Sequence, residues 1–88
     1  MANHPSAEKR HRQSLKRKAR HSAQRSQVLT STRKLEKAIQ DKDKKQADEL
    51  LKVVVSDVMR ARTRGTYHRN TAARKISRLH RLVSRSFS

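Results

Sequence analysis

The residues with the clearest chemical capacity are cations that crowd one stretch of the sequence. Between Lys9 and Arg20, seven of the twelve positions are lysine or arginine, which leaves only Leu15 and Ala19 for packing. A helix with cations on every side has no use in a protein core, but it can lie along phosphates, where each neutralised charge releases a counterion. This segment therefore predicts contact with a nucleic acid. The alternative is a solvated, partly disordered arm, because like charges repel each other.

A second basic segment, from Arg64 to Leu79, contains no acidic residue. Gly65 is expected to form a turn that delivers the start of a helix, whose free N–H groups attract phosphate. Ala72 and Ala73 are small enough to allow a close approach. The alternative makes Thr66 the N-cap of a helix with an ordinary solvated face. Donors of different shape are expected beside the helix start and along the turns that follow, namely His68, Arg69, Asn70, Arg74, Lys75, Arg78 and Arg81.

The sequence gives little indication of a metal site, a redox site or a catalytic site. No two of the five histidines stand four residues apart on one helix, and no carboxylate lies near enough in sequence to complete a metal site. The chain has no cysteine, which excludes disulfides, thiolate metal ligands and cysteine nucleophiles and fits a reducing interior. We therefore expect no metal, no cofactor and no enzymatic activity. The histidines concerned are His4, His11, His21, His68 and His80.

Length and charge narrow the class of protein further. The chain has 88 residues, with 24 lysines and arginines against 7 acids and a formal net charge of +17. A domain this short supports only a thin core, which excludes a large enzyme fold. Repulsion among the cations opposes folding, and a polyanionic partner would relieve it. No apolar run approaches the roughly 20 residues that span a bilayer, and no secretory signal is evident, so we expect a soluble intracellular protein.

The elements that must position these cations are predicted to be helices. One glycine, one proline and two aromatic residues are too few for the turns and strands of a sheet. The first helix is expected after Pro5, with Ser6 as its N-cap, and no breaker follows until residues 40–43. Its apolar residues recur every three or four positions and predict one narrow stripe. The stripe consists of Leu15, Ala19, Ala23, Val28, Thr32, Leu35 and Ile39.

Two further helices are expected. Residues 43–46, Asp-Lys-Lys-Gln, have the form of a capping box and predict the start of the second helix, which Gly65 ends as a left-handed cap. Three helices joined by short turns predict an all-α, antiparallel three-helix bundle with a long, basic first helix. The packing faces are expected to hold Ala47, Leu50, Leu51, Val54, Val58 and Ala61 of the second helix, flanked by Val55 and Met59, and Ala72, Ala73, Ile76, Leu79 and Val83 of the third.

Charge divides the chain into parts with different expected roles. Residues 1–25 carry a net charge of +7, residues 26–64 carry +4 with six of the seven acids, and residues 65–88 carry +6 with no acid. The middle therefore predicts a scaffold and the two ends a contact surface. We expect a single domain over residues 1–88, made of a basic arm or extended first helix (1–25), a helical bundle (26–83) and a frayed tail (84–88).

Three motifs resemble one known family. They are Ala2-Asn3 with Ser6-Ala7, the run Lys9-Arg10-His11-Arg12-Gln13-Ser14-Leu15-Lys16-Arg17, and Gly65 followed by His68-Arg69-Asn70, Ala72-Ala73-Arg74-Lys75 and Ser77-Arg78-Leu79. Over nearly the whole chain the sequence is similar to small-subunit ribosomal protein 20 of bacteria. The C-terminal motif is the more specific, since basic arms are common among ribosomal proteins. Two positions depart from that family's usual residues, His21 in place of Asn and Leu29 in place of Lys or Arg.

The resemblance implies a protein that binds 16S ribosomal RNA directly and stabilises and assembles the small (30S) ribosomal subunit in the cytoplasm. It implies few or no neighbouring ribosomal proteins as partners, no membrane and no small-molecule substrate. Specificity should come from RNA shape, because A-form major grooves exclude side chains. Together with the two basic segments, it gives the expected RNA-binding residues as Lys9, Arg10, Arg12, Gln13, Lys16, Arg17, Arg20, Arg25, Ser26, Thr30, Lys34, His68, Arg69, Asn70, Arg74, Lys75 and Arg78.

Other functions remain open at this point. A DNA-compacting or transcription-associated protein would carry similar charge and would bind duplex DNA comparably. A membrane-disrupting amphipathic peptide is disfavoured, because the basic arm has almost no apolar face. Tyr67 and Phe87 are too few aromatics for the stacking platform of single-strand binders, which favours folded or duplex RNA. Tyr67 is expected to pack over the end of the bundle, with base stacking as its alternative.

Overall fold

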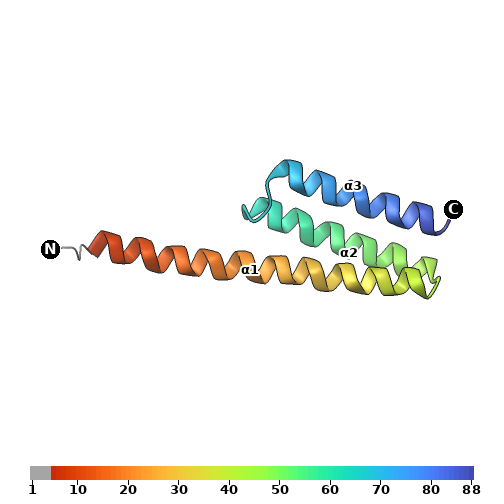
Figure 1. Cartoon of the computed structure of the whole chain (residues 1–88), viewed down its shortest axis with the longest axis horizontal. Coiled ribbons are helices and arrows are strands. Elements are labelled where there is room, and N and C mark those ends of the chain that lie inside the picture. Colours follow the sequence, from red (N-terminus) through yellow and green to blue (C-terminus); the bar gives the residue numbers. More distant parts are fainter. Residues whose placement is uncertain (1–4) are drawn as a thin grey trace.

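Three α-helices joined by two short turns make up the described chain (Figure 1). The structure, a computed structural model, describes residues 5–88, and this part of the chain contains no β-strand. The helices are α1 (Pro5–Gln40), α2 (Lys44–Thr63) and α3 (Arg69–Ser86). Each helix runs antiparallel to the one before it, so the predicted all-α three-helix bundle is confirmed.

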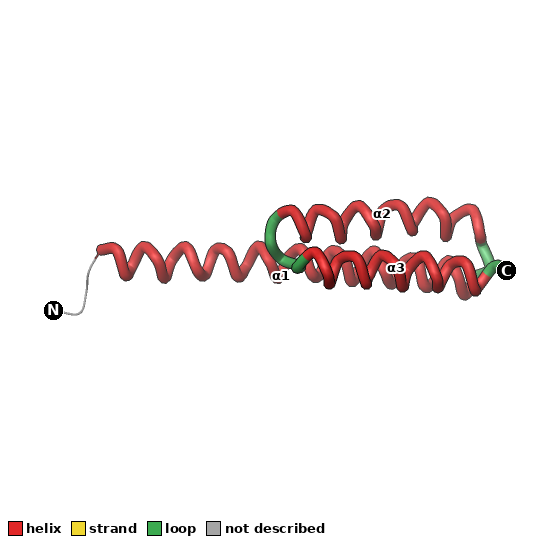
Figure 2. The backbone as a smooth tube through the Cα atoms, turned by 90° about the horizontal axis from the view of Figure 1, so that it is seen from above, coloured by secondary structure: helices red, strands yellow, loops and turns green. Residues whose placement is uncertain are grey.

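α1 is a continuous helix of 36 residues, which corresponds to about 54 Å at 1.5 Å per residue. Its N-terminal half projects past the other two helices, while its C-terminal half lies against them (Figure 2). Residues 6–20 are all exposed, and the first half-buried side chain along the helix is that of His21. Ser6 was predicted to be the N-cap of this helix. The helix already begins at Pro5, so Ser6 lies inside the first turn and is not the N-cap.

The predicted apolar stripe does not continue along the whole of α1. Leu35 is fully buried, whereas Leu15 is 54% exposed, and Ala19 and Ala23 are exposed as well. Twenty residues separate the two leucines, and at 3.6 residues per turn this places them about 200° apart around the helix. The prediction was wrong because the projecting half of α1 has no other helix to pack against, and because spacings of four drift around the helix. Leu15 therefore faces away from the bundle.

The turn between α1 and α2 forms where the sequence predicted it, with one of the two bonds of the predicted capping box. Asp43 is the N-cap of α2, and its Oδ1 accepts a hydrogen bond from the backbone N–H of Gln46 at 3.1 Å. The N–H of Asp43 donates to the carbonyl of Ala38, also at 3.1 Å. Lys42 adopts a left-handed φ of 59°. These local bonds reverse the chain between Gln40 and Lys44.

The core is small and centres on α2, which packs against both α1 and α3. Leu35, Val54 and Val58 are its largest fully buried side chains. Two residues that were predicted to pack, Met59 and Ala73, are exposed instead. The buried hydrophobic side chains are Val28, Leu35, Ala38, Ala47, Val54, Val58, Ala61, Ala72, Leu79 and Val83.

Gly65 forms the turn between α2 and α3. Its φ of 80° lies in the left-handed region, as predicted for a glycine that ends a helix. α2 ends at Thr63, and the backbone N–H of the C-cap Arg64 donates to the carbonyl of Arg60 at 3.0 Å. No atom lies within 4 Å of the place that a Cβ at Gly65 would occupy. Glycine is therefore required here by the backbone conformation and not by lack of space.

The N-cap of α3 is His68 and not Thr66. The Nδ1 of His68 accepts a hydrogen bond from the backbone N–H of Asn70 at 3.1 Å. Thr66 instead donates its hydroxyl proton to Oε1 of Gln24 on α1. This side-chain bond ties the α2–α3 turn to the point where α1 leaves the bundle.

α3 continues to Ser86, two residues into the tail of residues 84–88 that was expected to fray. The hydroxyl of Ser86 donates to the carbonyl of Leu82 at 2.7 Å. The N–H of Phe87 donates to the carbonyl of Val83 at 3.3 Å, and Phe87 packs against the core. This aromatic contact holds the last turn of the helix in place.

Candidate nucleic-acid interface

The projecting half of α1, residues 5–20, presents cations all around the helix, and we refer to it as the rod. Side chains one position apart differ by about 100° around the helix, so the close spacing of the cations leaves no neutral face. This half belongs to the long, basic first helix that the sequence predicted, and its contact with RNA stays a prediction. Its predicted contact residues are all exposed, and they are Lys9, Arg10, Arg12, Gln13, Lys16, Arg17 and Arg20.

Four predicted contacts lie on the half of α1 that belongs to the bundle. Arg25, Ser26, Thr30 and Lys34 are all exposed. The hydroxyl of Thr30 donates to the carbonyl of Ser26 at 2.9 Å, so its proton is engaged within the helix while its oxygen still has capacity to accept. Ser31, the next residue, is buried and takes part in a different set of contacts.

The predicted contacts on α3 are less uniform. Lys75 is half-buried, and its Nζ lies 5.1 Å from the centre of the Tyr67 ring. Tyr67 packs against the core, as expected. His68 is exposed, and because its Nδ1 accepts the capping bond, the proton of the neutral ring is on Nε2, which can donate outward. The other predicted contacts on α3 are exposed, and they are Arg69, Asn70, Arg74 and Arg78.

Two features expected at the start of α3 are corrected by the structure. Ala72 is 1% exposed and belongs to the core, so only Ala73 offers a small residue at the surface. The N–H of Asn70, which was expected to face phosphate, is occupied by His68. One of the N–H groups at this helix start is therefore already used, and the others remain for a ligand beside the side-chain donors.

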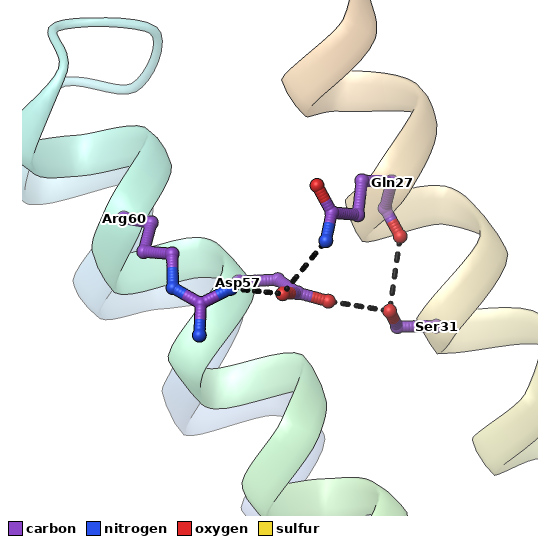
Figure 3. A network of polar contacts seen from close by, with 4 residues as sticks. All are labelled: Gln27, Ser31, Asp57 and Arg60. Carbon is purple, nitrogen blue, oxygen red and sulfur yellow. Dashed lines mark hydrogen bonds and ion pairs between the residues drawn. The ribbon is translucent and has the colours of Figure 1, made fainter.

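A buried carboxylate, absent from the predicted site residues, joins α1 to α2 (Figure 3). Asp57 is 7% exposed. Its Oδ2 accepts from Oγ of Ser31 at 2.5 Å, and its Oδ1 lies 3.4 Å from Nε2 of Gln27 and 3.5 Å from Nη1 of Arg60. A buried carboxylate needs such donors because removing its charge from water is costly. Its place three residues after Val54, on the apolar face of α2, was the signal available in the sequence.

A hollow of about 640 Å³ lies where the rod meets the α2–α3 turn. We refer to it as the corner site. Arg17 and Arg20 are among the contacts predicted from the sequence, and the other four lining residues are not. Those four could not be predicted as part of one site, because only the fold brings the turn against α1. The hollow is lined by Arg17, Arg20, His21, Gln24, Arg64 and Gly65.

Together, these features define a small, all-α and strongly basic protein whose exposed cations suit a polyanionic partner. Within residues 5–88, no group of three or more histidine, cysteine, aspartate or glutamate side chains is placed to hold a metal ion. None of the helices over the same residues is both long and apolar enough to cross a membrane.

Comparison with known proteins identifies the family. Residues 2–84 match the family model described as Ribosomal protein S20. A relative from Ruegeria sp. (strain TM1040) is 52% identical over 79 residues, which cover 90% of this chain and 91% of the relative. Relatives from Chelativorans sp. (strain BNC1) and Wolinella succinogenes are 49% and 44% identical, covering 94% and 97% of this chain and 94% and 93% of their own. All three are named small ribosomal subunit protein bS20. The chain belongs to the ribosomal protein S20 family.

Proposed function

We propose that the protein is a structural, non-enzymatic component of the small ribosomal subunit that binds 16S ribosomal RNA directly. The observation that carries this proposal is the distribution of charge over the fold. The rod and α3 expose all their lysines and arginines except Lys75, while six of the seven acids belong to residues 26–64. Family membership supplies the ribosomal context.

The rod and α3 contribute to binding in the same physical way. Each cation that meets a phosphate releases a condensed counterion, and the gain in counterion entropy drives association. Residues 6–20 of the rod are all exposed, so RNA backbones can approach most of its surface. On α3, Arg69, Arg74 and Arg78 extend a second cationic surface over the bundle.

The bundle sets the position of one cationic surface relative to the other. The rod is continuous with the bundled half of α1, so the packing of Leu35 against α2 also determines where the rod points. RNA segments bound to the rod and to α3 are thereby held in a defined relation. We place the protein on the ribosome in the cytoplasm, with ribosomal RNA as its main partner, few or no protein neighbours and no cofactor.

Binding of the purified full chain to 16S ribosomal RNA and to duplex DNA of equal length tests this proposal. We expect strong preference for the ribosomal RNA at physiological salt, together with co-sedimentation with the small subunit. Comparable affinity for duplex DNA would favour the DNA-compacting alternative. Failure to bind the ribosomal RNA at physiological salt would overturn the proposal.

A further inference from the structure

The corner site combines two parts of the chain that the sequence separates. Arg17, Arg20 and Gln24 approach it from α1, while Arg64 and Gly65 approach it from the α2–α3 turn. Three guanidinium groups therefore line one hollow, and within the described residues no carboxylate lines it. Unlike the open surface of the rod, the corner site can contact a ligand from two sides.

The turn side of the corner site is held in place by its own hydrogen bonds. Thr66 donates to Gln24 through its side chain, and its backbone N–H donates to the carbonyl of Ala61 at 2.8 Å. The N–H of Gly65 donates to the carbonyl of Arg62 at 3.0 Å. These N–H groups are thus already used, and the donors left for a ligand are the side chains of the lining residues.

The chemistry of these side chains fits phosphate. Guanidinium groups are planar, permanently charged and able to donate two parallel hydrogen bonds to phosphate oxygens. The open space beside Gly65, where no atom lies within 4 Å of a Cβ position, lets a ligand come close to the backbone. A volume of about 640 Å³ is in the range of small-molecule sites, so it suits a short piece of a single strand and not a duplex.

We propose that the corner site binds successive phosphates of one RNA strand that passes between the rod and the α2–α3 turn. Arg64 contacts the strand from the turn, and Arg17 and Arg20 contact it from the rod. This inference rests on the proposed function and adds Arg64, with His21 and Gln24 as neighbours, to the RNA-binding residues. Arg20 and Arg64 then act on the same strand, which predicts that their effects on binding are coupled.

Arg64→Gln and Arg62→Gln test the site as a matched pair. Both residues are exposed cations at the end of α2, but only Arg64 lines the corner site. We expect Arg64→Gln to weaken binding of the full chain to 16S ribosomal RNA at least tenfold and Arg62→Gln by less than threefold. Circular dichroism should show the same helix content for both.

Equal losses of RNA affinity in the two variants, with tight binding by the unchanged chain, would overturn the corner site and leave the proposed function standing. No binding by the unchanged chain would overturn both.

A double-mutant cycle tests whether Arg20 and Arg64 hold the same strand. If they do, the loss for Arg20→Gln/Arg64→Gln is smaller than the product of the two single losses. The control cycle, with Arg20→Gln and Arg62→Gln, should be multiplicative. Multiplicative losses in both cycles would mean that Arg20 and Arg64 act only through their general charge, which contradicts the proposal.

The three arginines of the corner site would also attract a free phosphate compound. Inorganic pyrophosphate is the probe for such a ligand. We expect pyrophosphate to shift the Nε–H resonance of Arg64 only at millimolar concentration. Saturation at micromolar pyrophosphate, together with unchanged RNA affinity in Arg64→Gln, would assign the corner site to a free anion and overturn its role in RNA binding.

Discussion

Ser31 donates its hydroxyl proton to Asp57 across the contact between α1 and α2, with 2.5 Å between Oγ and Oδ2. Both residues are buried. The Oγ of Ser31 also lies 3.0 Å from the carbonyl oxygen of Gln27. A hydroxyl has one proton, and the charged carboxylate is the stronger acceptor, so the proton is directed to Asp57. In a bundle with so small an apolar core, this contact helps to fix the register of α2 along α1.

Ser31→Ala removes the shortest hydrogen bond to the buried carboxylate. We expect it to lower the free energy of unfolding by about 1–3 kcal/mol, because Asp57 loses a donor that water cannot readily replace. Thr30→Ala is the control, since the Thr30 hydroxyl is exposed and bonds only within its own helix. Its effect should stay within about 0.5 kcal/mol. Urea unfolding followed by circular dichroism measures both, and similar losses would show that the contact contributes nothing specific.

Leu35→Ala and Leu15→Ala remove the same atoms from opposite faces of α1. Leu35 is fully buried and Leu15 is 54% exposed. We expect Leu35→Ala to destabilise the protein by about 2–5 kcal/mol through lost burial and the cavity it leaves. Leu15→Ala should change stability by less than about 0.5 kcal/mol. Thermal unfolding of the two variants checks the difference, and a large loss for Leu15→Ala would mean that the rod packs against the bundle.

Deletion of residues 1–20 should leave the bundle folded, because residues 6–20 make no buried contact with it. Binding to 16S ribosomal RNA should fall roughly a hundredfold or more, since seven cations are lost. Circular dichroism and filter binding give the two readouts. Unchanged affinity would remove the rod from the proposed interface.

Matched triple substitutions serve as the control for that deletion. Each removes three exposed positive charges from one helix, so a purely general charge effect would make them equal. We expect the rod variant to lose at least ten times more RNA affinity than the α2 variant. The rod variant is Arg10→Gln, Arg12→Gln and Lys16→Gln, and the α2 variant is Lys44→Gln, Lys45→Gln and Lys52→Gln.

Salt should weaken RNA binding steeply. If about eight phosphates are neutralised, the logarithm of the association constant should fall against the logarithm of salt concentration with a slope of about six to seven in magnitude. Filter binding over a range of potassium chloride concentrations measures the slope. A slope of one or two would contradict a binding mode dominated by phosphate contacts.

Lys42 and Gly65 both have a left-handed φ, and we expect substitutions at these two positions to change stability in opposite directions. Gly65→Ala should destabilise the protein by about 1–2 kcal/mol, because an L-residue resists the φ of 80° even with open space around it. Lys42 has a left-handed φ of 59°, and Lys42→Gly removes the strain of an L-residue in this conformation. Part of this stabilisation is offset because glycine has more backbone entropy in the unfolded chain, so the variant should be neutral to stabilising. Chemical unfolding compares them, and destabilisation by Lys42→Gly would contradict the argument.

Features that depend on residues a few positions apart could be predicted from the sequence. The scarcity of glycine, proline and aromatic residues set the all-α class, and the capping box at Asp43 and the glycine at position 65 set the two turns. Such signals act through hydrogen bonds and backbone preferences within one or two turns of helix. The crowding of cations between Lys9 and Arg20 likewise required no knowledge of the packing.

Which helix faces and which distant residues meet could not be predicted, because these contacts depend on how the three helices pack. Small errors in helical phase accumulate along α1, so the predicted stripe assigned Leu15 to the wrong face, and nothing local showed that Phe87 would hold the end of α3. The pairing of Ser31 with Asp57 and of Gln24 with Thr66 depends on how α1 lies against the rest of the bundle. The corner site exists for the same reason, since the packing of α2 on α1 brings Arg64 beside the rod.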